Sequence, residues 1–310
     1  MKPIRVAIIG ASGIGRFHVR EFLRSGADVV AIVGTSDESV KKTAASLFEY
    51  RISPQVYTSI DSLIASKSVD AVSICAPPEF HFDFAKKCLL AELHVLCEKP
   101  FVFNSGHDNV MLAAELLTIA KERGLVVSVN TQWPSVLKYC KPFVNMTKVT
   151  DFYMYMQPQS LGKEMLFEQV SHMNSILVHL IPNGEAKGIR FSHTDGEELG
   201  VYFSYANSET ACSVHYRFKH KKERPRDLSF FINGVQFERR VTDGYQQTLV
   251  TGGSVIKIQD PLSVSVNMFV DAIRKKADPL VSPEEIIENM VLQDQIVKEY
   301  ITHFENEFLI

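Results

Sequence analysis

The segment "IIGASGIGRFH", residues 8–18, carries three closely spaced glycines directly after a short apolar run. Gly10 lets a chain turn sharply at the end of a strand, and Gly13 and Gly15 let the backbone at the start of a following helix approach a ligand. Helix N-termini favour negative charge. The spacing therefore predicts a phosphate-binding turn formed by Gly10, Ser12, Gly13, Ile14 and Gly15.

A lysine follows another apolar run, at the end of "HVLCEKP", residues 94–100. Lys99 thus lies just beyond an expected strand, and in a doubly wound sheet this end of a strand borders the ligand crevice. Partial burial brings the pKa of an ammonium group toward the range in which it exchanges protons. The sequence predicts an acid–base role for Lys99, with an ion pair to Glu98 as the structural alternative.

Short apolar runs alternate with longer amphipathic stretches between residues 5 and 129. We expect strands at residues 5–10, 29–34, 70–77, 94–100 and 125–130, and helices at 15–26, 37–49, 79–91 and 105–123. Such a series folds into a parallel sheet with right-handed crossovers and helices on both faces. The fold class is therefore α/β, with a Rossmann doubly wound parallel sheet in a domain that spans residues 1–128.

The pattern changes after Trp133. We expect a helix over 163–181 and strands of alternating polarity at 188–193, 199–206, 211–220, 228–234 and 235–241. Asn233-Gly234 predicts a tight hairpin, and Ser282, Pro283 and Glu285 predict the start of the last helix. These features indicate an α+β domain over residues 129–310 with a large, open, mostly antiparallel sheet.

The glycine turn resembles that of the short-chain dehydrogenases, whose chemistry requires a Tyr-x-x-x-Lys pair on one helix. No tyrosine of this chain is followed by a lysine four residues later. Tyr216 and Lys219 come nearest, but they are three residues apart in an expected strand. The short-chain mechanism is therefore excluded.

Residues 70–100 resemble the Gfo/Idh/MocA family of NAD(P)-dependent oxidoreductases. The resemblance rests on Ala76-Pro77-Pro78 and His81 at and after the end of the strand expected at 70–77, on the Glu98-Lys99-Pro100 signature that ends the strand expected at 94–100, and on the glycine turn. The family's motif Gly-x-Gly-x-x-Gly-x-x-His matches Gly10, Ser12, Gly15 and His18, with serine at the middle glycine. The resemblance implies that the following residues bind the cofactor beside the turn: Ala76, Pro77, Pro78, His81, Glu98 and Lys99.

The end of the second strand bears on the choice between NAD and NADP. NAD enzymes usually carry an acidic residue there that binds the ribose 2′-hydroxyl. This strand instead ends in Gly34-Thr35-Ser36, which is small and neutral, and Lys41 and Lys42 follow. We expect Thr35 and Ser36 to contact the cofactor and NADP to be favoured, whereas a contact from Asp37 would favour NAD.

The family's second motif, Asp-x-x-x-His, matches Glu168 and His172, with glutamate in place of aspartate. The four-residue spacing places both side chains on one face of a helix. The resemblance implies that Lys99, His172 and Glu168 are catalytic: His172 exchanges the hydroxyl proton, Lys99 shares it, and Glu168 positions the histidine. The alternative is a solvent-facing Glu168 and a core His172. His179 lies two turns further on, too far for shared ligation, so no metal is expected.

The resemblance also implies the substrate class. The expected reaction moves a hydride between the cofactor and a secondary hydroxyl or keto group of a sugar, a sugar derivative such as a nucleotide sugar, or a cyclitol. Lys99, Glu168 and His172 are expected to contact the substrate, together with Asn130, Gln132 and Trp133 near the domain junction. Interdomain packing is the alternative for Trp133. The alternative function is a sensor that binds cofactor and sugar without turnover.

The composition excludes some classes of partner. The formal net charge is −3, and a chain of mixed charge has no field that attracts nucleic acid or a membrane. The five cysteines never form a CxxC pair, which is typical of reduced thiols in a cytoplasmic protein. The basic run of residues 217–226 predicts a charged hairpin tip, with a diphosphate site as the alternative. The resemblance implies a homodimer or homotetramer formed through the open sheet.

Overall fold

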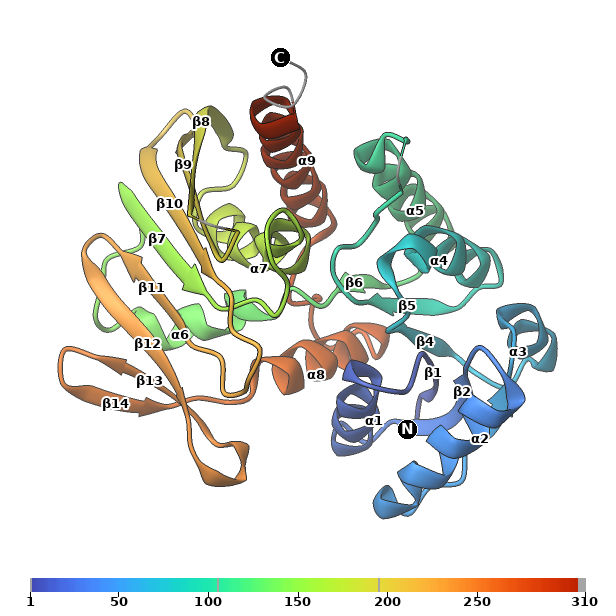
Figure 1. The fold of residues 1–310 in the computed structure, drawn as a ribbon. Coiled ribbons are helices and arrows are strands. Elements are labelled where there is room, and N and C mark those ends of the chain that lie inside the picture. The colour runs from blue at the N-terminus through green and yellow to red at the C-terminus, as the bar shows by residue number, and fades with distance from the viewer. Residues whose placement is uncertain (1, 105, 195, 306–310) are drawn as a thin grey trace. The chain divides into compact units, whose positions relative to one another are not determined.

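The chain divides into two compact units, each with its own sheet (Figure 1). The computed structural model describes residues 2–104, 106–194 and 196–305. The first unit comprises the chain up to Gln132 together with Leu262–Ile286, and the second comprises Trp133–Pro261 and the chain from Ile287 onward. The segment 262–286 therefore packs with residues that lie far from it in sequence.

The first unit is built on a six-stranded sheet in which every neighbouring pair is parallel. Its order is β3-β2-β1-β4-β5-β6. The prediction of a doubly wound parallel sheet is confirmed. The strands are β1 (Arg5–Ile9), β2 (Asp28–Val33), β3 (Gln55–Tyr57), β4 (Ala71–Ile74), β5 (His94–Cys97) and β6 (Val127–Val129).

The helices of this unit begin and end at residues with clear local signals. Ser36, Ser59 and Asp108 each accept a hydrogen bond from the backbone N–H three residues later, and Gly124 ends its helix at a φ of 64°. The elements are α1 (Ile14–Arg24), α2 (Asp37–Ser46), η1 (Leu47–Tyr50), α3 (Ile60–Ser66), η2 (Pro78–Phe80), α4 (His81–Leu90), α5 (Asn109–Arg123) and, from the later segment, α8 (Pro261–Ile273).

Strand β3 and helix α3 are missing from the sequence prediction, which contains five parallel strands instead of six. Residues 55–57 are only three long, and α3 is only seven. Elements this short give no periodic pattern of their own, and β3 takes its place in the sheet only through its pairing with β2. The consequence for the site is that residues 58–61, which follow β3, are not anticipated as ligand contacts.

The order of the strands creates a switch point between β1 and β4. From β1 the chain proceeds outward through β2 and β3, and it then returns to β4 and proceeds to the other edge. Neighbouring strands whose connections leave in opposite directions open a crevice at their carboxyl ends. The glycine turn after β1 and residues 75–77 after β4 lie at this crevice.

The second unit contains an eight-stranded sheet of order β14-β13-β12-β11-β7-β10-β9-β8. Only the β7–β10 pair is parallel among the pairs described, so the prediction of a mostly antiparallel sheet is confirmed. The strands are β7 (Asp151–Met156), β8 (Glu185–Thr194), β9 (Glu198–Ala206), β10 (Ala211–Lys219), β11 (Leu228–Ile232), β12 (Val235–Val241), β13 (Gln247–Thr251) and β14 (Ser254–Lys257).

One face of this sheet packs against helix α7 (Glu164–Leu180), as Figure 1 shows. Alternate residues of the central strand β7, Phe152, Met154 and Met156, are buried in the same core as the apolar side of α7. Tyr153 and Tyr155 point to the opposite face and are partly exposed. The remaining elements are η3 (Trp133–Val136), α6 (Leu137–Cys140), η4 (Asp243–Tyr245) and α9 (Pro283–Glu305).

Two short-range predictions are confirmed. Asn233 and Gly234 connect β11 to β12 with φ values of 49° and 78°, and Ile232 pairs directly with Val235. Both turn residues are in the left-handed region that a two-residue hairpin requires. At α9, the Ser282 N–H donates to Glu285 Oε2 at 2.7 Å and the Glu285 N–H donates to Ser282 Oγ at 3.2 Å, which is a capping box.

The expectation of a hairpin tip within residues 217–226 is wrong. Strand β10 is separated from β11 by β7, because β7 pairs with both of them. Residues 220–227 therefore cross the end of β7 instead of forming a tight hairpin. The sequence prediction lacks β7, whose central place in the sheet only the pairing reveals.

No helix in the described parts of the chain combines the length and the apolar character needed to cross a bilayer.

Helix α8 contributes to the core of the first unit. Phe269 is fully buried and its ring meets that of Phe22 edge to face at 6.2 Å. We expect Phe269→Ala to lower the free energy of unfolding by about 3–5 kcal/mol, because the cavity adds to the lost apolar burial. The exposed Met111, in the same unit, supplies the control: Met111→Ala is expected to change it by less than about 0.5 kcal/mol. Urea denaturation followed by circular dichroism measures both, and equal effects would contradict this packing.

Candidate functional site

The glycine turn after β1 leaves no room for side chains at two of its positions. A Cβ on Gly10 would lie 2.8 Å from the carbonyl oxygen of Cys75, and a Cβ on Gly15 would lie 2.1 Å from the carbonyl oxygen of Gly10. Gly10 and Gly13 also have φ values of 83° and 55°. Glycine is therefore required at Gly10 and Gly15 by close packing, and at Gly10 and Gly13 by backbone conformation.

The N-terminus of α1 has the form of an anion-binding site. Gly13 is its N-cap residue and supplies no side-chain cap, and the first turn contains no acidic residue. Ile14, the first residue of the helix, is 43% exposed. The Gly15 N–H donates to the Ser12 carbonyl at 3.0 Å, and the N-cap residue offers no side-chain acceptor to the other N–H groups of the first turn. The helix dipole favours negative charge at this point.

A pocket of about 610 Å³ opens beside this turn, at the switch point of the sheet. Among the residues predicted to bind cofactor, Gly10, Ser12, Thr35, Ala76 and Pro77 line it. The lining also includes residues that the sequence prediction does not contain: Ser39, Thr43, Thr58, Ser59, Asp61, Phe80, Phe84 and Lys87. Those from residues 58–61 follow β3, so a correct prediction of that strand would have indicated them.

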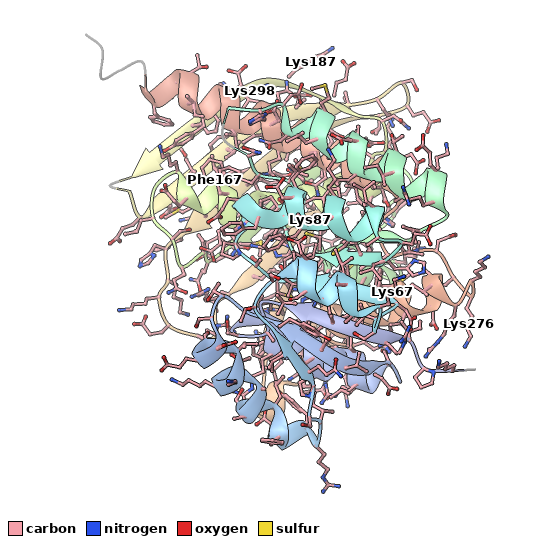
Figure 2. All side chains as sticks on the ribbon, turned by 90° about the vertical axis from the view of Figure 1, so that its right-hand side faces the viewer. Lys67, Lys87, Phe167, Lys187, Lys276 and Lys298 are labelled. Carbon is pink, nitrogen blue, oxygen red and sulfur yellow. The ribbon has the colours of Figure 1, made fainter. Side chains whose placement is uncertain are left out.

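Two of these additional features give the pocket its character. The rings of Phe80 and Phe84 stack at 5.5 Å, with an interplanar angle of 15°. Lys87, which lies on α4 (Figure 2), pairs with both carboxylate oxygens of Asp61 at 2.8 and 2.9 Å. One wall is thus flat and apolar, and the rim carries a charge pair that is already neutralised.

Ser36 acts in the structure as the N-cap of α2, since its Oγ accepts the Ser39 N–H at 3.2 Å. Ser36, Lys41 and Lys42 are all exposed and are not among the residues that line the pocket. The neutral character of the strand end is as predicted, because Gly34 and Thr35 are the lining residues there.

A buried hydrogen-bonded network connects the elements around the switch point. His18, on α1, faces Ser73 Oγ of β4 with Nδ1 at 2.8 Å and Glu98 Oε1 with Nε2 at 2.9 Å. Asn130, directly after β6, donates from Nδ2 to the same Glu98 oxygen. All four side chains are less than 10% exposed. Asn130 thus contacts Glu98 within the first unit.

The charges of His18 and Glu98 depend on each other. Burial alone would lower the pKa of His18, but Cys75 and the carboxylate of Glu98 raise it to about 10. Burial would likewise raise the pKa of Glu98, but the hydrogen bond and charge of His18, with help from Lys99 and Asn130, lower it to about 2. An imidazolium–carboxylate pair therefore persists across the neutral range.

Lys99 continues directly from this network and is partly buried. Its backbone N–H lies 3.4 Å from Glu98 Oε2, and the peptide bond to Pro100 is cis. His81 is fully buried, with Nδ1 2.8 Å from the Pro100 carbonyl and Nε2 2.9 Å from the Ala76 carbonyl. His81 thus joins the loop after β4 to the loop after β5, and Pro78 begins the short helix η2 between them in sequence.

In the second unit, α7 carries both Glu168 and His172, as predicted. The Glu168 carboxylate accepts hydrogen bonds from the N–H groups of Gln159 and Ser160 and from Ser160 Oγ at 2.7–3.2 Å. Arg226 Nη1 lies 3.7 Å from it. These contacts hold the loop that precedes α7 in place. The sequence prediction does not include this role of Glu168.

His172 and Trp133 lie together. Their rings meet edge to face at 6.5 Å, and they are 8% and 4% exposed. The guanidinium carbon of Arg239, on β12, is 5.6 Å from the centre of the Trp133 ring. Gln132, the last residue of the first unit, is partly buried. Arg239 is absent from the sequence prediction, because nothing in "VQFERRV" distinguishes it from Arg240.

Within residues 2–104, 106–194 and 196–305, no group of three histidine, cysteine, aspartate or glutamate side chains could hold a metal ion. His179, at the end of α7, is exposed.

Comparisons with known proteins agree with this geometry. The model of the oxidoreductase family Gfo/Idh/MocA, NAD-binding Rossmann fold, matches residues 4–131. UDP-N-acetylglucosamine 3-dehydrogenase of Acidithiobacillus ferrooxidans is 33% identical over 130 residues, which are 42% of this chain and 37% of the relative. The matched segment is thus well under half of that relative's length.

Solved structures resemble the chain over nearly all of its length. The A. ferrooxidans enzyme superposes with a TM-score of 0.73 at 19% identity, covering 96% of this chain and 97% of that one. Scyllo-inositol dehydrogenase from Lactobacillus casei, with bound NAD(H) and scyllo-inositol, gives 0.73 at 13% identity and covers 96% of each chain. At these identities the likeness concerns the fold. The match to the Gfo/Idh/MocA oxidoreductase family thus covers residues 4–131, and the solved structures extend the likeness of fold to the rest of the chain.

Proposed function

We propose that this protein is an NAD(P)-dependent oxidoreductase that acts on a secondary hydroxyl or keto group of a sugar, a sugar derivative or a cyclitol. The observation that carries the proposal is the turn at Gly10 and Gly15, packed too closely for any side chain and followed by an uncapped helix N-terminus. Such a turn at the switch point of a doubly wound sheet suits a dinucleotide pyrophosphate. The names of the relatives supply the substrate class.

The residues present fit a nicotinamide dinucleotide. The N–H groups at the start of α1 would hold the pyrophosphate, and the 610 Å³ pocket with its stacked Phe80 and Phe84 would hold the adenosine half. When bound, the nicotinamide supplies or accepts the hydride. NADP is the proposed preference, because the pocket has no carboxylate at the end of β2, where Gly34 and Thr35 line it.

In this proposal the protein's own part of the reaction is proton handling. Lys99 follows the carboxyl end of β5, held there by the Glu98 network. His172 lies against Trp133 on α7. His172 exchanges the substrate hydroxyl proton and Lys99 shares it, while Glu168 fixes the start of α7. Gln132 and Trp133 are further proposed substrate contacts, and Asn130 acts through Glu98.

We further propose that the protein forms a homodimer or homotetramer through the sheet face opposite α7. Tyr153, His215 and Tyr202 make a continuous aromatic row on that face, with ring distances of 4.9 and 4.1 Å. Such patches commonly serve as protein interfaces.

The first prediction concerns cofactor selectivity. Titration followed by nicotinamide fluorescence is expected to show tighter binding of NADPH than of NADH. Thr35→Asp is expected to shift this ratio toward NADH by about tenfold or more, because a carboxylate at the strand end repels a 2′-phosphate and accepts from a 2′-hydroxyl. Lys42→Ala is the control and should leave the ratio unchanged, since Lys42 does not line the pocket. Failure of both cofactors to bind would overturn the proposed function.

The second prediction concerns catalysis. A panel of sugars, cyclitols and nucleotide sugars, followed at the nicotinamide absorbance band, is expected to reveal a substrate. With that substrate, Lys99→Ala is expected to lower kcat/KM by about two to four orders of magnitude while cofactor affinity is retained. Lys86→Ala removes a surface ion pair with Glu115 and a contact with the Phe82 ring, and it should have no effect on kcat/KM. Full activity of Lys99→Ala would refute the assigned role, and cofactor binding without any turnover would indicate a sensor.

The third prediction concerns assembly. The chain has a mass of 34.9 kDa. Light scattering after size-exclusion chromatography is expected to give two or four times this mass. A mass equal to that of one chain at every concentration tested would contradict the proposed association.

A further inference from the structure

Arg239 is a cation set into the covered side of the second unit's sheet. It lies on β12 two residues after Phe237, which is fully buried, so both side chains leave the same face of the strand. Its Nη2 donates to the carbonyl oxygen of Arg226. Its Nε is shielded from solvent and has no hydrogen-bond partner among the described residues.

The charge of Arg239 also lacks a direct counter-ion. Within the described residues, no carboxylate lies within ion-pair distance of its guanidinium, whereas Arg217 pairs with Glu198 and Arg226 approaches Glu168. Asp227 and Asp260 act on it through charge alone, and Arg224 opposes them. Burial lowers the pKa of Arg239. A partly buried cation without a carboxylate partner costs free energy, which an incoming anion recovers.

Trp133 places this cation beside the candidate acid–base residue. The guanidinium carbon lies 5.6 Å from the centre of the indole ring, and the centre of the His172 ring lies 6.5 Å from it, so the indole contacts both groups. Trp133 is 4% exposed, and its Nε1 has no acceptor among the described residues. A buried indole N–H normally has one. The cluster therefore offers a second donor besides Arg239 to a ligand.

The loop of residues 220–227 adds further positive charge nearby. Arg226 donates from Nε to the Lys221 carbonyl and from Nη2 to the Lys222 carbonyl, which fixes the loop, and its own carbonyl receives Arg239. The side chains of Lys222 and Arg224 are exposed. Exposed cations around a partly buried one attract anions and guide them toward it.

We propose that Arg239 binds a negatively charged group of the substrate, a carboxylate or a phosphate. A guanidinium fork matches the oxygens of both groups. The inference rests on the proposed function in that it names the class of sugar derivative used: one that carries an anionic substituent and presents its hydroxyl to His172. It makes Arg239 a specificity-determining residue.

The test uses the fluorescence of Trp133, the single tryptophan of the chain. The full-length protein is titrated at constant ionic strength with D-glucuronate as the carboxylate probe, inorganic phosphate as the phosphate probe, and D-glucose as the neutral control. We expect a saturable change with at least one anion and none with glucose, and the anion that acts identifies the group recognised. No response to either anion, or an equal response to glucose, would overturn the proposal.

Variants on the same strand separate a specific site from general charge. Arg239→Met is expected to weaken anion binding by about tenfold or more, and Arg239→Lys, which keeps the charge but loses the fork, by less. Arg240→Met is the matched control, because Arg240 is exposed and pairs with Glu238. Equal affinities in the Arg239 and Arg240 variants would refute the assignment. If Arg239→Met does not fold, Arg239→Lys is compared with Arg240→Met instead. Weaker anion binding by Arg239→Lys than by Arg240→Met supports the assignment, and equal affinities refute it.

The fluorescence readout does not require turnover. If the protein binds anions through Arg239 and yet binds no nicotinamide cofactor, that result would support the anion site and refute the proposed function. Turnover of neutral sugars that Arg239→Met leaves unchanged would support the proposed function and refute the anion site at Arg239.

Discussion

The hydrogen bond between His18 and Glu98, 2.9 Å long and shielded from solvent, holds helix α1 to the carboxyl end of β5. Two charges buried in this way cost several kcal/mol each unless they are paired and further hydrogen-bonded. Ser73 and Asn130 supply those additional bonds from β4 and from the residue after β6. One pair thus connects four elements at the edge of the sheet where a ligand would bind, and Lys99 is the next residue in the chain.

The close packing of the glycine turn extends this constraint to the cofactor pocket. Gly15 lies against Gly10, and Gly10 lies against the backbone of Cys75, with no space for a methyl group at either contact. His18 follows Gly15 by three residues on the same helix. A shift of α1 would therefore disturb the phosphate-binding turn and the Glu98 network together. This coupling gives the histidine of the motif a structural role: His18 aligns the glycine turn with the segment that carries Lys99.

The charged side chains Glu168 and Arg239 of the second unit have partners of a different kind. Glu168 is satisfied by backbone and hydroxyl donors from residues 159 and 160, and its task is to hold the loop before α7. Arg239, by contrast, meets the ring of Trp133 and one carbonyl oxygen, and it pairs with no carboxylate in the described ranges of the chain. The first unit holds the buried charges of His18 and Glu98 as a pair within its parallel sheet. An unpaired cation in the other unit suits recognition of a particular substrate.

The sequence by itself determined the features that depend on neighbouring residues. The glycine spacing of the turn, the hairpin at Asn233-Gly234 and the capping box at Ser282 can be recognised from residues within a few positions of each other, and α7 follows from its own periodicity. The tertiary structure decided the rest. The partner of His18 lies 80 residues away, β3 and β7 take their places through pairing with other strands, and Arg239 differs from Arg240 only in the face of the sheet it occupies. Local propensity contains no information about contacts of such separation, because they form only when the whole core excludes water.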